Sequence, residues 1–495
     1  MSTFLKKMIM NCDDEEVNMT PLTLTAEEAN STVKLTKLGS PTVDGVQYRI
    51  GTSGGWSPYT IDTEITLTNV GDCVQFQNIL ETLGTDSSNY VQFVMTGKIA
   101  ASGNCMAMLN FSKSVPTYAF YYMFGECTSL TSAPELPATT LNTGCYNCMF
   151  INCTSLVNVP TILPATTLAD NCYASMFKHC MNLVNAPALP ATTLKYYCYG
   201  DMFANCTSLT TAPELPATTL ADYCYNGIFQ GCTSLINAPV LPATTLNTYC
   251  YQNMFYGCKS LVNAPILPAT TLANYCYYEM FRDCKSLVNA PELPATILTN
   301  SCYYGMFRSC TSLVNAPALP ATTLGNYCYY SMFLGCTALV TAPELPATTL
   351  ANSCYLWMFD YCKSLVNAPA LPATILTKSC YSNMFRDCTS LVNAPELPAT
   401  TLADYCYNSM FQGCSLLVNA PELPATVLVD YCYQNMFNRC TKLNYIKVNF
   451  SSWVDNTTNN WVAGVSSTGV FNAPSDLPVI VGDSNVPTGW TVTNN

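Results

Sequence analysis

The sequence predicts an α/β solenoid built from 26-residue strand-turn-helix units, with a small all-β module before it and a cap after it. Three observations lead to this prediction. A phrase close to CTSLVNAPELPATTLADYCYNSMFQG recurs from Cys127 to Cys440, its first cysteine returns every 26 residues from Cys206 onward, and apolar residues keep fixed places in each copy. A period of this size, held over about twelve units, is typical of solenoids, in which each unit buries its apolar face only between two neighbours.

The chain before the repeats divides into two parts. Residues 1–20 are expected to be a flexible leader with an acidic run from Asp13 to Glu16. Residues 21–100 alternate apolar and polar side chains, as in Val46/Tyr48/Ile50, and contain turn signals such as Gly-Gly-Trp-Ser-Pro. This pattern predicts an all-β, sandwich-like module. Two roles remain open for it: a docking domain, or a cap over the open face of the first repeat.

The solenoid itself is expected over residues 101–440. In the copy that begins at Cys388, Leu402, Cys406, Met410 and Cys414 follow each other at intervals of four, which predicts one face of an α-helix of about three turns. The preceding Thr-Ser-Leu-Val-Asn-Ala stretch predicts a short strand. That strand must end near Pro395, because proline cannot donate to a ladder.

The last part, residues 441–495, is interpreted as a C-terminal cap. Ile446, Val448 and Phe450 suggest one strand, and Trp453 and Trp461 belong to an apolar cluster. The short segments between them are not expected to fold alone. Degenerate end units of this kind are usual in repeat arrays, because one side of each faces solvent.

The motif Cys-Tyr-x-x-Met-Phe-x-x-Cys, as in Cys432 to Cys440, followed by Cys-Thr-Ser-Leu, resembles the BspA-like leucine-rich repeat family. The resemblance covers roughly residues 119–445 and recurs in every unit. Departures from the family pattern are the longer period, the second cysteine and the Pro-x-Leu-Pro turn. The resemblance implies a leucine-rich-repeat-like array in a surface-exposed protein that adheres to host proteins or to other cells.

Composition excludes some partners. Only 10% of the residues are charged, against a usual share of about 25%, and the formal charge is −12. No basic stripe is present, so neither nucleic acid nor an anionic membrane surface is expected as a partner. No stretch reaches the roughly 18 apolar residues of a membrane span, so no membrane insertion is expected. The N-terminus shows no recognisable signal peptide and the C-terminus no anchor.

The 29 cysteines raise the question of disulfides or metal. Thirteen belong to the first series and twelve to the second, from Cys145 to Cys432. On a helix, Cys406 and Cys414 would lie about 12 Å apart, beyond the roughly 7 Å that a disulfide spans. Buried reduced thiols are therefore favoured over disulfides, although exported proteins tend to oxidise. Cys145 and Cys148 form a lone C-x-x-C, which chance explains better than zinc, so neither a metal nor a cofactor is expected.

Catalysis has little support. His179 is the only histidine and stands beside Lys178 at a variable position, which favours a solvated side chain. The sequence has no Gly-x-Ser-x-Gly motif and no glycine-rich phosphate loop. No catalytic residue is proposed, and the protein is expected not to be an enzyme.

The acidic and amide positions are the candidate binding residues. The residue after the first proline is glutamate in some units and apolar in others, and in most units asparagine stands three residues before it. One interpretation is solubility and correct stacking; the other is a partly acidic strip that contacts an extended partner. The candidates are Glu135, Glu214, Glu292, Glu344, Glu396, Glu422, Asn289, Asn315 and Asn393. The tyrosine after the second cysteine is expected to pack with its hydroxyl at the rim, and the residue before that cysteine, often tyrosine, to face solvent.

The leading hypothesis is a non-enzymatic binding scaffold, engaged in adhesion or receptor binding through its repetitive face. The expected partner is a host or bacterial surface protein or a glycan, and the expected location is extracellular, on a cell surface or a virion. The alternative is a structural component of a phage virion or filament, in which the β-module docks and the array projects. Homo-oligomer formation or assembly through the β-module is compatible with either.

Overall fold

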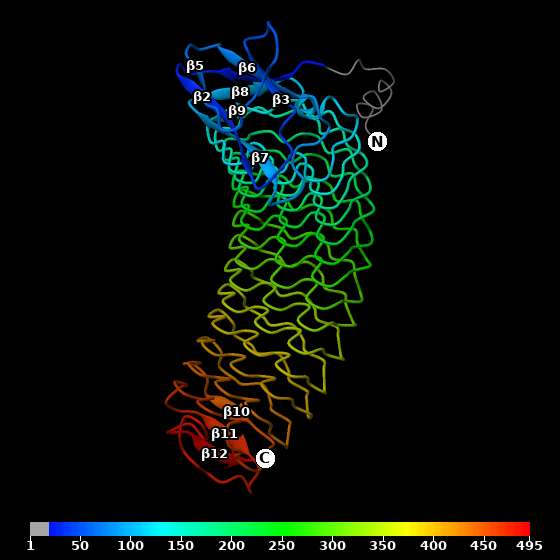
Figure 1. The fold of residues 1–495 in the computed structure, drawn as a ribbon. Helices are drawn as coiled ribbons and strands as arrows, with labels where there is room; N and C mark the ends of the chain where they lie inside the picture. The colour runs from blue at the N-terminus through cyan, green and yellow to red at the C-terminus, as the bar shows by residue number, and fades with distance from the viewer. Residues whose placement is uncertain (1–18) are drawn as a thin grey trace.

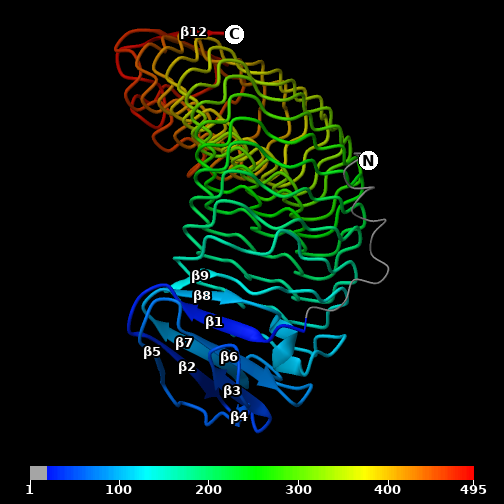
Figure 2. The same ribbon diagram turned by 90° about the horizontal axis from the view of Figure 1, so that it is seen from above.

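The computed structural model describes residues 19–495, so nearly all of the expected leader lies outside the described residues. Figure 1 shows a β-rich module at one end, a long stack of coils, and a small sheet at the other end. Figure 2 shows that the stack curves along its length. The fold is thus a repeat solenoid, as predicted, preceded by a small β-module.

The N-terminal module holds two sheets that share one core. The larger has the strand order β4-β3-β6-β1-β8-β9, and the smaller has the order β5-β2-β7. Within the module, neighbouring strands are antiparallel. The elements are β1 (Leu22–Ala26), β2 (Ser31–Leu38), β3 (Val46–Ile50), β4 (Ser57–Pro58), β5 (Ile65–Leu67), β6 (Cys73–Asn78), β7 (Tyr90–Thr96), β8 (Ile99–Ser102), the 3₁₀ helix η1 (Cys105–Leu109) and β9 (Leu130–Ser132).

The module and the first coil share a sheet and a core. Strand β9 belongs to the first coil and pairs in parallel with β8 of the module, with Ile99 opposite Leu130. Phe93 of β7 donates its N–H to the carbonyl of Met123, and its ring stacks on Phe124 at 5.1 Å between centroids. The module therefore covers the open face of the first coil.

The prediction of an α-helix in each repeat unit is wrong. Residues 405–413 and their counterparts, here called the turn segment, form a chain of β-turns. In this copy the N–H groups of Cys406 and Asn408 donate three residues back, to Ala403 and Tyr405, whereas the N–H of Tyr407 donates to Cys432 in the next coil. The alternation continues to the end of the segment, so every second N–H bonds within its own turn and the others bond to the following coil.

The backbone reverses direction every four residues because one residue in four has a left-handed conformation. In this copy those residues are Tyr405, Ser409 and Gly413, with φ values of 58°, 52° and 75°. Such triplets recur in fourteen turn segments of the described chain, from Tyr118, Tyr122 and Glu126 to Asn456, Asn460 and Gly464. Glycine, asparagine and aspartate, which tolerate the left-handed region best, fill many of these positions.

The four-residue spacing explains the error. Leu402, Cys406, Met410 and Cys414 are buried, as a helix would have them. An α-helix, however, advances by about 400° over four residues, so a stripe at intervals of four drifts by about 40° per step. Along the chain of turns, successive four-residue turns keep the same orientation. Leu402, Cys406, Met410 and Cys414 therefore all point to the interior of the coil, without the drift that a helix would give them.

The predicted strand is reduced to single paired residues. On this side most successive coils pair at a single asparagine or threonine, for example Asn237, Asn263, Asn289 and Asn315. A second row of parallel bridges joins the Thr-Thr stretches, as in Thr245 and Thr271. The two prolines that follow each asparagine limit the pairing, which is the effect expected from their missing N–H groups.

Two aromatic ladders fill the interior of the coils. The phenylalanine ladder continues from Phe124 to Phe437 with 5.3–5.9 Å between ring centroids and ends against Trp461. The tyrosine ladder runs from Tyr146 to Tyr433 at 5.6–6.0 Å. The prediction that its hydroxyls lie at the rim is wrong: these side chains are at most 1% exposed, because they point into the coil.

The cysteines of both series lie beside these ladders. All described cysteines are free thiols, and those of the two series are buried. From Cys153 to Cys440, each thiol of the first series donates to the carbonyl of a phenylalanine in the preceding coil, at 3.0–3.2 Å. Thiols rather than disulfides therefore satisfy this geometry.

The C-terminal region continues the coil pattern. Strands β10 (Tyr445–Lys447), β11 (Val470–Ala473) and β12 (Thr491–Asn494) form a parallel sheet that extends the asparagine row, because Tyr445 pairs with Asn419. The N–H of Phe437 donates to Trp461, as it would to the next coil. Repeat geometry thus extends past residue 440.

Candidate binding surface

Each coil presents solvent-facing side chains at the same positions on its strand side. In the coil that begins at Cys388 these are Val392, Asn393, Glu396 and the pair Thr400–Thr401. The leucines and the alanine between them are buried. The first threonine of the pair is present and exposed in every coil from Thr139 to Thr426. Stacking of the coils converts these positions into continuous rows, which we call the strand-side rows.

The glutamates and asparagines predicted to bind all lie in these rows, and all nine are exposed. Parallel bridges place Asn289 directly between Asn263 and Asn315, and Asn393 beside Asn367. The structure therefore brings the predicted residues together on one side of the coil. Two of the glutamates lie at the ends of the array: the backbone of Glu135 pairs with the N-terminal module, and Glu422 forms an ion pair with Lys447 at 3.0 Å.

Glu396 and Glu422 occupy adjacent coils and line a groove of about 490 Å³. Its walls are formed by four prolines, Pro395, Pro398, Pro421 and Pro424. Proline side chains are rigid, so this part of the surface is preorganised.

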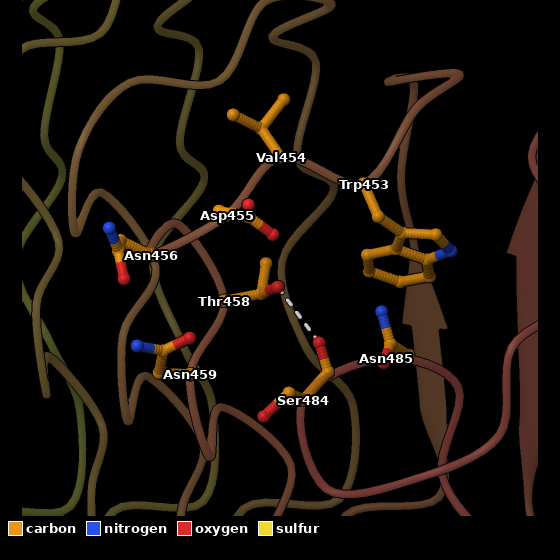
Figure 3. A pocket seen from close by; sticks show the side chains of 8 residues that line it. All are labelled: Trp453, Val454, Asp455, Asn456, Thr458, Asn459, Ser484 and Asn485. Atoms are coloured by element: carbon orange, nitrogen blue, oxygen red, sulfur yellow. Dashed lines mark hydrogen bonds between the residues drawn. The ribbon is translucent and has the colours of Figure 1, made fainter.

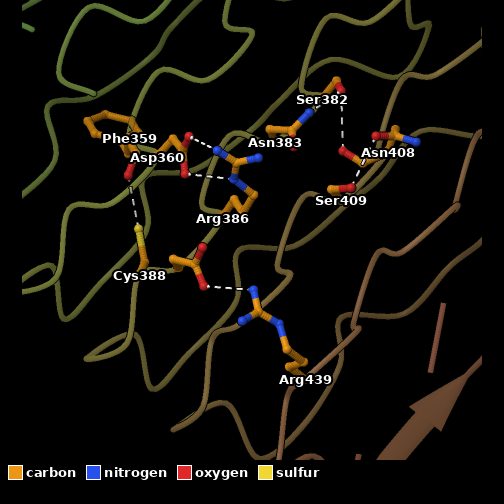
Figure 4. Close-up of polar contacts among 10 residues, drawn as sticks. Phe359, Asp360, Ser382, Asn383, Arg386, Cys388, Asn408, Ser409 and Arg439 are labelled. Atoms are coloured by element: carbon orange, nitrogen blue, oxygen red, sulfur yellow. Dashed lines mark hydrogen bonds and ion pairs between the residues drawn. The ribbon is translucent and has the colours of Figure 1, made fainter. Parts of the chain in front are cut away.

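The turn side of the coils carries ion pairs between neighbouring coils (Figure 4). Arg386 donates two hydrogen bonds to the carboxylate of Asp360, at 3.0 and 2.7 Å, and Asp360 is 1% exposed. Burial raises the pKa of Asp360, and Arg386 opposes that rise. Arg439 reaches across two coils to Asp387 at 3.0 Å. These ion pairs join different coils. Because Arg386 binds the carboxylate of Asp360, that carboxylate is not available as a general acid or base.

A second hollow lies in the C-terminal region, with a volume of about 350 Å³ (Figure 3). Trp453 lines one side, and Asp455, Asn456, Asn459 and Asn485 line the rest. The indole N–H of Trp453 is already bonded to the carbonyl of Pro478, which fixes the ring. The lining is polar, and it offers side-chain amides rather than a nucleophile with a base.

The turn side also carries a feature that the sequence pattern did not reveal. Tyrosines at three different positions of the coil join into one line of ring contacts that begins at Tyr196 and ends at Trp357. We call this line the aromatic path. Solvent-facing tyrosines before the second cysteine were predicted, but the shift of the line to another position, at Tyr278, depends on how the coils stack.

Groups suited to catalysis or metal binding do not gather in residues 19–495. Among those residues no three histidine, cysteine or acidic side chains are placed to hold a metal ion. The pKa of His179 is lowered by burial and by Lys178, so its ring is neutral near pH 7. Cys145 is buried whereas Cys148 is partly exposed, and burial raises the pKa of Cys148 to about 11.

The repeat geometry agrees with a comparison of sequences. The family described as "BspA type Leucine rich repeat region" matches residues 174–288, 222–365 and 357–480, with six copies. The chain belongs to this family. Its matched region covers more than half of the 495 residues, and it confirms the resemblance inferred from the Cys-Tyr-x-x-Met-Phe-x-x-Cys motif.

The other comparisons add little. Among curated proteins no relative matches the chain. One matching solved chain comes from a structure described as "Crystal structure of TLR13-ssRNA13 complex"; it is 14% identical with a TM-score of 0.23, and the match covers 74% of this chain and 49% of that one. The chain thus spans about half the length of that protein, and so low a TM-score supports no argument about fold or ligand.

Membership of this repeat family favours a non-enzymatic scaffold that binds other molecules, and the family is typically associated with surfaces. Within residues 19–495, no helix is both long enough and apolar enough to cross a bilayer.

Proposed function

We propose that this protein is an adhesin, which binds proteins on a host or bacterial surface through its strand-side rows. The observation that supports this most directly is the repetition of exposed side chains: each coil offers the same valine, asparagine and threonine positions at one coil spacing from the last. A partner that contacts one coil weakly is held near the next. Weak contacts then add through effective concentration.

The chemistry of the rows indicates the kind of protein segment that fits. The valine row is partly exposed, with Val262 at 40% and Val314 at 37%, and supplies apolar contact. Glu292, Glu344 and Glu396 add negative charge beside it. An extended segment with alternating apolar and basic side chains complements both rows, since opposite charges across an interface favour association.

The same arrangement suggests an extracellular or cell-surface location. A stack of many equivalent contacts suits a partner that is itself repeated or extended, as surface proteins are, better than it suits a small molecule in one pocket. The strand-side surface with low charge and rigid proline walls is preorganised for such contact.

The test removes whole coils from the middle of the array. Deleting residues 284–309, 284–335 or 284–361 removes one, two or three 26-residue units and leaves the stacking register intact. Binding of each purified chain is measured on immobilised collagen, laminin and fibronectin and on intact bacterial cells. We expect the affinity for the bound partner to fall with each unit removed. An affinity that does not depend on the number of coils contradicts the proposal.

A matched variant isolates the acidic positions. The position after the first proline is alanine in other coils, at Ala188, Ala318 and Ala370, so alanine is compatible with the fold there. Replacing Glu214, Glu292, Glu344 and Glu396 by alanine should weaken binding and reduce its dependence on salt. The melting temperature should change little, because all four side chains are exposed.

A further inference from the structure

The aromatic path crosses the turn side as an unbroken line of rings. Tyr223, Tyr249 and Tyr275 stack on one another in successive coils, with centroids 4.5 and 4.6 Å apart. Tyr275 then contacts Tyr278, 6.1 Å away in its own coil, and the line continues from this second position. Partly exposed tyrosines on one side of six consecutive coils are therefore in contact.

The second half of the path has the same construction. Tyr278, Tyr304 and Tyr330 stack at 4.5 and 4.3 Å, and Trp357 packs edge-on against Tyr330 at 5.2 Å. The hydroxyl of Tyr304 interacts with those of Tyr278 and Tyr330. Because the ring faces are covered by neighbouring rings, the exposed part of these half-buried side chains is formed mainly by ring edges.

The fold does not require tyrosine at these places. The position of Tyr249 is serine at Ser301, Ser353 and Ser379, and the position of Tyr304 is asparagine at Asn226 and Asn408. Tyr223, Tyr249 and Tyr275 also have left-handed backbones, with φ between 57° and 59°. Ser301, Ser353 and Ser379 have the same left-handed conformation, so it belongs to the coil and not to the path. Because serine and asparagine fill the same places in other coils, the stacked tyrosines are not needed to form the coil, and a binding role is a candidate reason for them.

The coils that carry the second half of the path also carry a row of fixed amides, two residues before the second cysteine. Asn274, Asn300, Asn326 and Asn352 occupy one position in four consecutive coils, and each is exposed. The side-chain oxygens of Asn274, Asn300 and Asn326 accept the backbone N–H of the next asparagine at 3.0, 3.0 and 3.1 Å. Because the oxygen is used in this way, the NH₂ group of each amide remains available as a donor to solvent or to a ligand.

From these two features we propose that the aromatic path and the row from Asn274 to Asn352 bind an extended, neutral glycan chain. Sugar hydroxyls pair with tyrosine hydroxyls and with amide donors, and a chain whose residues repeat at nearly the coil spacing meets one such set per coil. This site lies on the turn side and does not depend on the protein-binding role of the strand-side rows.

Other linear ligands fit less well. Nucleic-acid bases bind by stacking on open ring faces, and their phosphates need basic side chains, whereas the inner rings of the path are covered and the net charge of the chain is −12. Proline-rich peptides also pack against open aromatic faces in a groove. The edges of the tyrosine rings with their hydroxyl groups, together with the fixed amides of the same coils, favour a ligand with many hydroxyl groups over nucleic acids and over proline-rich peptides.

The experiment measures binding of cellohexaose, mannohexaose and chitohexaose to the full chain by isothermal titration calorimetry. The variant Tyr249→Ser/Tyr275→Ser/Tyr304→Asn introduces residues that occupy the same positions in other coils, so it should fold normally. We expect at least a tenfold loss of affinity for the hexasaccharide that binds. The matched control Tyr405→Ser/Tyr431→Ser removes a stacked pair at the same position outside the path and should bind as the unaltered chain does.

A second variant isolates the amides. Asp170 and Asp222 occupy the asparagine position in other coils and accept the same backbone N–H at 3.1 Å. Asn300→Asp/Asn326→Asp therefore keeps this bond and removes only the NH₂ donors, and it should weaken hexasaccharide binding about tenfold. The proposal is overturned if no hexasaccharide binds, if the tyrosine variant binds equally well, or if decaproline binds through the path instead.

Discussion

The thiol of Cys388 donates a hydrogen bond to the carbonyl oxygen of Phe359, which lies 29 residues earlier in the preceding coil, at 3.1 Å. The same carbonyl accepts the backbone N–H of Cys362 in its own coil. One oxygen thus joins two coils, and the arrangement recurs along the array. The cysteines of the first series are thus hydrogen-bond donors that join neighbouring coils.

Stability should fall in alkaline solution. Burial raises the pKa of Cys232 and of Cys336 to about 12, whereas a thiol in an unfolded chain ionises near pH 8.5. The folded chain therefore keeps protons that the unfolded chain releases, so this contribution is complete below about pH 8.5 and is lost as the pH rises toward 12. Urea midpoints measured in reductant should be nearly constant from pH 7 to 8 and fall steeply by pH 10. Equal midpoints at pH 8 and pH 10 would contradict the burial of these thiols.

Phe307→Ala should loosen the array locally. The ring of Phe307 stacks between Phe281 and Phe333, with centroids 5.6 and 5.7 Å away, and it is fully buried. Its removal should cost about 3–5 kcal/mol. Hydrogen exchange should accelerate in the adjoining coils and remain slow near Phe150 and Phe411, because each coil contacts only its neighbours. Uniform acceleration along the chain is the opposing result, and the partly exposed Val314→Ala serves as the mild control.

Ser309→Gly should stabilise the protein. Ser309 has a φ of 60°, and its counterpart in the next coil is Gly335. Glycine relieves the left-handed strain, which is worth about 1 kcal/mol. The neighbouring Ser312 has no such conformation, so Ser312→Gly should destabilise by about 0.5–1 kcal/mol through the added freedom of the unfolded chain. Thermal melting of both variants tests the turn geometry, since a helix at this position would make both glycines unfavourable.

Arg386→Ala should be strongly destabilising, by about 3 kcal/mol, because it leaves the buried carboxylate of Asp360 unpaired. The double variant Asp360→Leu/Arg386→Leu should recover most of this loss, since Leu334 occupies the corresponding position one coil earlier. Arg439→Ala, which breaks a pair whose arginine is 59% exposed, should cost less than about 1 kcal/mol. Urea denaturation compares the three, and similar losses for the two arginines would show that the Asp360 pair is not buried in solution.

The solenoid was predictable because the spacing of Cys206, Cys232 and Cys258 is a property of sequence alone. The helix prediction failed because intervals of four fit both a helix and a chain of four-residue turns. A distinguishing signal was present: the position before the first cysteine is glycine at Gly231, Gly257, Gly335 and Gly413, and asparagine or aspartate in several other coils. Residues that favour left-handed backbones at regular intervals indicate successive turns rather than a helix.

The surface features were predictable only in part from the sequence. The exposure of Glu396 and Asn393 follows from their place between buried leucines, and the structure places them as expected. The burial of the Tyr407 hydroxyl did not follow, because a sequence pattern does not show which way a ring points within its turn. The aromatic path required the structure as well, since the contact between Tyr275 and Tyr278 joins two positions that a repeat alignment keeps apart.

The alternating hydrogen bonds of the turn segments give every inner coil the same upper and lower surface. Removal or insertion of one 26-residue unit therefore keeps the backbone hydrogen bonds between neighbouring coils, and recombination between repeats can lengthen or shorten the rod in such steps. Because the β-module and the C-terminal sheet cover the two ends, such a change leaves the termini intact. The length of the rod can therefore change during evolution, through gain or loss of repeats, without a change in how each coil folds.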